Sequence, residues 1–106
     1  LYRSIPLVAD VYERILKNLN YSVEKVTDEN LLLDKLEEGV HYSFVLYDVK
    51  PFENMPCLIG DIIRNEGAIP VAFVPENLKD REWCSEQMIA MNAGPIEIQE
   101  ALEQNQ

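Results

Sequence analysis

The chain has 106 residues, of which 47% are hydrophobic, and this is enough for one folded domain with a core of its own. Nineteen acidic residues against nine basic ones give a net charge of −10, which argues against binding to nucleic-acid phosphates or to anionic membranes. No apolar run approaches the roughly 20 residues of a membrane span. Cys57 and Cys84 match no metal or redox spacing, so we expect reduced thiols and a cytoplasmic location.

Apolar residues recur at a helical period near the start of the chain and predict an amphipathic helix over residues 5–19. Ser4 is expected to cap this helix, with Pro6 in its first turn and Asn20 at its end. The positions that we assign to its apolar face are Leu7, Val8, Val11, Ile15, Leu16 and Leu19.

Residues 21–26 alternate between apolar and polar side chains and predict a strand near the edge of a sheet. A second helix is expected over residues 29–38, with Thr27 or Asp28 as its cap and Gly39 at its end. The residues that we expect on its inner face are Leu31, Leu32 and Leu36.

The rest of the chain alternates apolar strands with helices. We expect strands over residues 44–47, 69–74 and 88–91, helices over residues 55–65 and 96–103, and a short, weak helix over residues 79–87. Strands separated by helices pair in parallel through right-handed crossovers, so the pattern predicts an α/β fold with a doubly wound parallel sheet. Only Leu1 and Tyr2 are left to supply a further strand, so we expect the chain to begin inside a truncated first strand.

The order and spacing of several short motifs resemble the receiver domain of two-component response regulators. These motifs are Asp48 after a strand, Ile63-Arg64 at a helix end, Ile69-Pro70-Val71 in the next strand, and Pro6 and Asn20-Tyr21 around the first helix. The resemblance covers essentially the whole chain. It implies a single domain over residues 1–106, a five-stranded sheet in the order 2-1-3-4-5 with helices on both faces, and a short fourth helix.

The resemblance makes Asp48 the candidate phosphoacceptor. Receivers hold Mg²⁺ with an acidic pair, with this Asp and with a backbone carbonyl, which here would be that of Lys50. The acidic pair falls on Arg3 and Ser4, and neither side chain is an anionic ligand for a hard cation. We hypothesise that Arg3 or Lys50 pairs with the Asp48 carboxylate instead and makes it a poorer nucleophile.

Three further family positions are degenerate in this sequence. The family's Ser or Thr, whose hydroxyl contacts the phosphoryl group, falls on Pro75. The family's aromatic switch residue falls on Met91, and its lysine before a proline falls on Gly94. The family's peptide bond at this last position is typically cis, so the resemblance implies a cis bond between Gly94 and Pro95.

We therefore predict a degenerate receiver-like domain of two-component phosphorelay signalling, acting through protein contacts with a sensor kinase, an output domain or a second copy. Two alternatives stay open. One is a functional receiver that is phosphorylated on Asp48 by a histidine kinase and then needs Mg²⁺. The other is a flavodoxin-like domain that binds a small ligand. With His41 as its single histidine and without a glycine-rich phosphate loop, the sequence predicts no enzyme and no other cofactor or metal.

Overall fold

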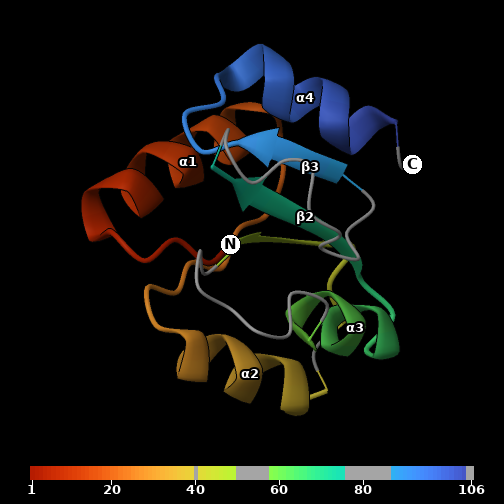
Figure 1. Cartoon of the computed structure of the whole chain (residues 1–106). Coiled ribbons are helices and arrows are strands. Elements are labelled where there is room, and N and C mark those ends of the chain that lie inside the picture. Colours follow the sequence, from red (N-terminus) through yellow and green to blue (C-terminus); the bar gives the residue numbers. More distant parts are fainter. Residues whose placement is uncertain (40, 50–57, 76–86, 105–106) are drawn as a thin grey trace. The chain divides into compact units, whose positions relative to one another are not determined.

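The computed structural model describes residues 1–39, 41–49, 58–75 and 87–104 (Figure 1). Its contacts divide the chain into two compact units, Leu1–Val40 and His41–Gln106. The first unit contains the helices α1 and α2, and the second contains the strands β1, β2 and β3 with the helices α3 and α4. Cys57, Cys84 and Lys50 lie outside the described residues.

Helix α1 spans Pro6–Asn18, with Pro6 in its first turn as predicted. The predicted cap at Ser4 is wrong, because the capping position falls on Ile5. A proline suits the first helical position and holds the preceding residue in an extended conformation, and Ile5 has that conformation. Asn20 ends the helix with a left-handed φ of 71°, and its N–H donates to the carbonyl of Lys17 at 3.0 Å.

The apolar face assigned to α1 is only partly correct. Leu16 is buried together with Ala9 and Tyr12, whereas Leu7 and Val11 are exposed. Both sets of residues recur at a spacing of three or four, so the helical period alone did not identify the buried row.

Helix α2 spans Glu29–Glu37, and Asp28 is its cap. The N–H of Asn30 donates to Oδ1 of Asp28 at 2.7 Å, which satisfies one of the free donors of the first turn. Gly39 follows the helix with a φ of 80°. The inner face consists of Leu32 and Leu36, as predicted, but Leu31 is 51% exposed.

The predicted strands at the start of the chain and over residues 21–26 do not form. These segments meet in one isolated parallel bridge between Tyr2 and Val26. The N–H of Val26 donates to the carbonyl of Leu1 at 2.9 Å, and the N–H of Arg3 donates to the carbonyl of Val26 at 3.3 Å. A ladder needs several successive pairs, and the residues before α1 supply only this one.

The prediction of a five-stranded doubly wound sheet in the order 2-1-3-4-5 is therefore wrong. The residues that the structure describes form a three-stranded parallel sheet in the order β1-β2-β3. Its strands are β1 (Phe44–Asp48), β2 (Ile69–Val74) and β3 (Gln87–Ala90), close to three of the predicted strands. Of the predicted helix over residues 79–87, only Gln87 is described, and it begins β3.

Two helices accompany this sheet and lie on opposite sides of it (Figure 1). Helix α3 spans Leu58–Asn65 and helix α4 spans Pro95–Glu103, in agreement with two predicted helices. The most deeply buried side chains of this unit come from the strands and from both helices: Tyr47, Val71, Phe73, Val74, Ile63, Ile98 and Leu102. Strands packed between helices on both faces are apolar along their length, and β2 has this pattern.

The expected cis bond between Gly94 and Pro95 is wrong, because the described part of the chain contains no cis peptide bond. Pro95 begins α4, and Gly94 before it is extended, with a φ of −90° and a ψ of −179°. A trans bond suits this arrangement, since proline favours the first helical position and an extended residue before it.

Candidate functional site

The candidate site lies at the carboxyl ends of the three parallel strands. In the sheet register Asp48 pairs with Phe73, and Val74 pairs with Ala90, so the ends of all three strands meet at one edge. The N–H of Val49 donates to the carbonyl of Phe73 at 3.3 Å and continues the pairing beyond β1. Ligands of open α/β sheets collect at this edge, which makes it the place to look for chemistry.

Asp48 ends β1, as the sequence predicted. Its side chain is half-buried and its Oδ1 atom is fully buried. Tyr47 and Val49 on either side of it are buried as well. The carboxylate is therefore carried by a well-packed strand end, and rigid elements of this kind position a reactive group accurately.

Three of the degenerate family positions lie at the same edge. Pro75 directly follows β2, Met91 directly follows β3, and Gly94 precedes α4; all three are half-buried. Proline has neither a hydroxyl nor a backbone N–H, methionine offers a weakly accepting thioether, and glycine has no side chain. Among the described residues, Pro75, Met91 and Gly94 thus supply no hydroxyl and no ammonium group to a phosphoryl oxygen.

Two other predicted site residues, Arg3 and Ser4, are not part of this unit. Arg3 and Ser4 belong to the first unit, where Ser4 is exposed and Arg3 is only 5% exposed. The Cζ atom of Arg3 lies 4.7 Å from the centre of the Tyr12 ring, which is a cation–π contact. The pairing of Arg3 or Lys50 with Asp48 stays a prediction.

The contact of Tyr12 with Arg3 was not predicted from the sequence. A signal for it was present, because Ala9, Tyr12 and Leu16 repeat at positions i, i+3 and i+7 of α1. The predicted apolar face followed the longer row of aliphatic residues instead, because charged residues lie beside Tyr12 in the sequence.

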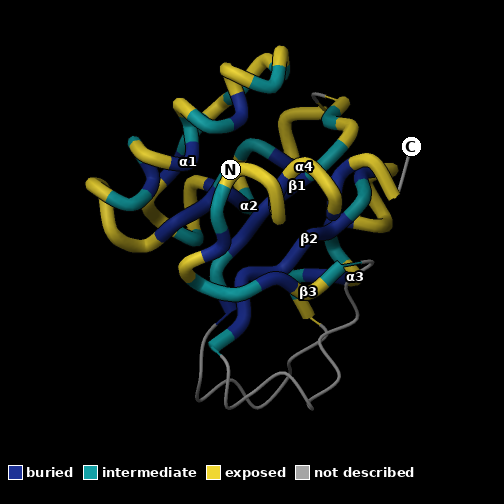
Figure 2. The backbone as a smooth tube through the Cα atoms, turned by 90° about the horizontal axis from the view of Figure 1, so that it is seen from above, coloured by how far each residue is buried: buried dark blue, intermediate teal, exposed yellow. Residues whose placement is uncertain are grey.

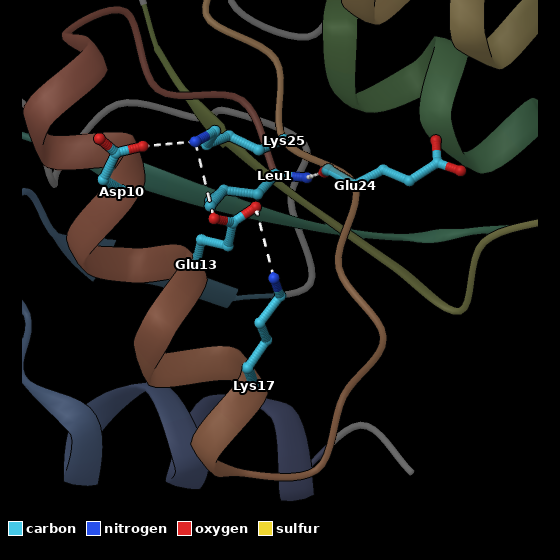
Figure 3. A network of polar contacts seen from close by, with 6 residues as sticks. All are labelled: Leu1, Asp10, Glu13, Lys17, Glu24 and Lys25. Carbon is cyan, nitrogen blue, oxygen red and sulfur yellow. Dashed lines mark hydrogen bonds and ion pairs between the residues drawn. The ribbon is translucent and has the colours of Figure 1, made fainter.

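A cluster of charged side chains connects α1 with the segment before Val26 (Figure 3). Lys25 forms a hydrogen-bonded ion pair with Asp10, and its ammonium lies 3.6 Å from a carboxylate oxygen of Glu13. The hydrogen bond from Lys25 lowers the pKa of Asp10, and the same bond raises the pKa of Lys25. Lys17 lies 4.0 Å from Glu13 on the same helix. The cluster joins residues far apart in the sequence, and no motif predicted it.

In the described ranges, no three or more His, Cys, Asp or Glu side chains gather into a group that could hold a metal ion. His41 is exposed and lies next to Gly67 in the second unit. A separate finding concerns the helices: none of those described has both the length and the apolar character needed to cross a membrane.

Comparison with known proteins gives one structural similarity. No protein-family model matches this sequence, and no curated protein matches it. A solved structure described as the yeast Spc42 trimeric coiled coil, amino acids 181–211, fused to another structure, is similar with a TM-score of 0.75 and 16% identity. The match covers 98% of this chain and 74% of that chain, so it extends well beyond the short coiled-coil segment that the description names. At this identity the similarity concerns the fold alone.

Proposed function

We propose that this chain is a degenerate receiver-like domain of two-component signalling that acts by contact with other proteins. The observation that carries the proposal is the edge of the sheet, where Asp48 ends β1 while Pro75 and Met91 follow the neighbouring strands. A carboxylate stands at the position of the family's phosphoacceptor. The described residues that follow the neighbouring strands, Pro75 and Met91, lack the groups with which receivers handle a phosphoryl oxygen.

The chemistry of phosphoryl transfer supports this choice. Transfer to a carboxylate needs Mg²⁺ or another cation to compensate the charge of the transferred group. Arg3 and Ser4 stand at the positions of the family's acidic pair, and a guanidinium repels Mg²⁺. A domain of this kind would present one conformation to a partner, because no phosphoryl group shifts it between two states.

A second candidate is a functional phosphoacceptor at Asp48. It is favoured by the position of Asp48, because the residue is half-buried at a strand end and so retains some exposure to solvent. This candidate requires Mg²⁺, with ligands that the sequence does not identify.

Beryllofluoride with Mg²⁺ separates the two candidates, since this anion mimics an aspartyl phosphate. The measurement is a two-dimensional NMR spectrum of the whole chain, with the Asp48→Asn variant as the matched control. We expect no shifts beyond those of the control. Shifts that start at Asp48, extend to Met91 and vanish in the control would establish a functional phosphoacceptor and contradict the proposal.

A further inference from the structure

The segment between α1 and α2 has little backbone pairing where the sequence predicted a strand. Its one β-bridge joins Val26 to Tyr2. Before the bridge, the carbonyl of Glu24 accepts a hydrogen bond from the nitrogen of Leu1 at 2.9 Å. A single bridge gives much less support than a ladder of successive pairs, so side chains must contribute to holding this segment. We call residues 21–26 the strap.

Two neighbouring side chains of the strap form ion pairs with two different helices. Lys25 pairs with Asp10 of α1, and its ammonium lies 3.6 Å from a carboxylate oxygen of Glu13 on the same helix. Glu24 pairs with Lys35 of α2, at a distance of 3.2 Å between ammonium and carboxylate oxygen. Figure 3 shows the side chains of Glu24 and Lys25 pointing in opposite directions, as successive side chains of an extended segment do. The strap is therefore held from both sides by opposite charges.

The two helices have buried residues of their own and do not depend on these ion pairs. Figure 2 shows buried and exposed positions along α1. The residues that the helices bury are Ala9, Tyr12 and Leu16 on α1, and Leu32 and Leu36 on α2. Burial of apolar surface is not an interaction between charges, so screening by salt leaves it in place.

We propose that the strap is a conformational device that rising ionic strength releases while α1 and α2 stay folded. The side chains of Lys25 and Glu24 are 30% and 49% exposed, so dissolved ions reach both pairs. The screening length falls from about 10 Å at 0.1 M salt to about 3 Å at 1 M, which weakens pairs of this kind. Release frees Tyr2 and Val26, which are each 7% exposed in the closed arrangement.

The first unit thus has a closed and an open state, and salt shifts the balance between them. Burial of Tyr2 and Val26 favours the closed state, so the open state is a local opening that costs less than unfolding of the whole unit. The inference does not depend on the proposed function, because the strap belongs to the first unit and Asp48 belongs to the second.

Amide hydrogen exchange of the whole chain, followed by NMR at about 0.1 M and about 1 M sodium chloride, tests the inference. The reporter is the N–H of Val26, which donates to the carbonyl of Leu1 at 2.9 Å. The reference is the N–H of Tyr12 within α1. We expect salt to accelerate exchange at Val26 by about threefold or more relative to Tyr12, because two exposed ion pairs are weakened together.

Variants connect the effect to the strap. Combining Lys25→Met with Glu24→Gln should accelerate exchange at Val26 in low salt and remove most of its response to salt. Lys17→Met is the matched control for Lys25→Met, because Lys17 lies 4.0 Å from Glu13 but belongs to α1 itself. It should leave exchange at Val26 close to that of the unchanged chain.

Three results would overturn the inference. Exchange at Val26 that does not respond to salt means that charge does not hold the strap. Equal acceleration at Val26 and Tyr12 means that the unit opens as a whole. An equal effect of Lys17→Met and Lys25→Met means that the pairs made by Lys25 have no special part in holding the strap.

Discussion

Gly67 follows α3 in a backbone conformation that glycine adopts readily, with a φ of 84°. Its N–H donates to the carbonyl of Arg64 at 2.9 Å, so the conformation closes the end of the helix. A Cβ atom at this position would lie 3.3 Å from Cε1 of His41. Gly67→Ala therefore introduces two separable costs, one from the backbone and one from the contact with His41.

The backbone cost is about 1–2 kcal/mol for a residue with a Cβ in the left-handed region. It is offset in part by about 0.4–1 kcal/mol, because alanine stiffens the unfolded chain. The contact is tight by a few tenths of an ångström, and His41 is exposed and able to turn away. Turning it off its preferred rotamer adds about 0.5 kcal/mol. We expect a total loss of about 0.5–2 kcal/mol in the free energy of unfolding.

The chain offers a matched comparison at Gly39, which follows α2 with a φ of 80° and has open space around its Cβ position. Gly39→Ala should show the backbone cost alone. Urea unfolding of Gly67→Ala, His41→Ala and the double variant then isolates the contact through a double-mutant cycle. If the excess of Gly67→Ala over Gly39→Ala persists in the His41→Ala background, the contact is not its cause and the reasoning fails.

Two further predictions concern the first unit. Asp28→Ala should lower the free energy of unfolding by about 1 kcal/mol, because it removes the side-chain cap of α2. Thr27→Ala should have little effect. If the two variants lose equal stability in urea unfolding, the assignment of the cap is contradicted. Lys25→Met should raise the pKa of Asp10 towards its ordinary value of 3.8, which an NMR titration of the carboxyl carbon measures. The lowered pKa of Asp10 stabilises the fold above pH 3.8, and this contribution is lost as the pH falls through the pKa of the folded state. The raised pKa of Lys25 stabilises the fold below pH 10.5, and this contribution is lost as the pH rises through the pKa of the folded state. Lys25→Met should therefore lose stability between these two pH values and not in strong acid.

The central strands could be predicted because their sequence signals are local and strong. Residues 69–74 form an apolar run of strand length that ends at Pro75, and β2 has these bounds. The position of Asp48 at the end of β1 follows from the same kind of signal. Asp28 as a cap and Asn20 as a helix end depend on side chains and conformations within a few residues, and the structure has both.

Other features depend on contacts that the local pattern does not encode. Tyr2 and Val26 are 24 positions apart, and they form one bridge where two strands were expected. Leu7 and Val11 have the spacing of a buried face, but α1 buries Tyr12 and its neighbours instead. Lys25 and Asp10 are 15 residues apart and carry no motif. In each case tertiary contact decided between patterns that the sequence left equivalent.

The same distinction applies to the candidate site. Parallel strands bring their carboxyl ends to one edge whatever side chains they carry, so the position of Asp48 is a consequence of the β1-β2-β3 sheet. Its chemistry depends on the neighbours at that edge, which among the described residues include Pro75 and Met91. Under the proposed function, the strand-end carboxylate is a feature that the fold retains although the groups that activate it in receivers are replaced. For this reason the Asp48→Asn comparison with beryllofluoride tests activity, whereas the position of Asp48 alone does not.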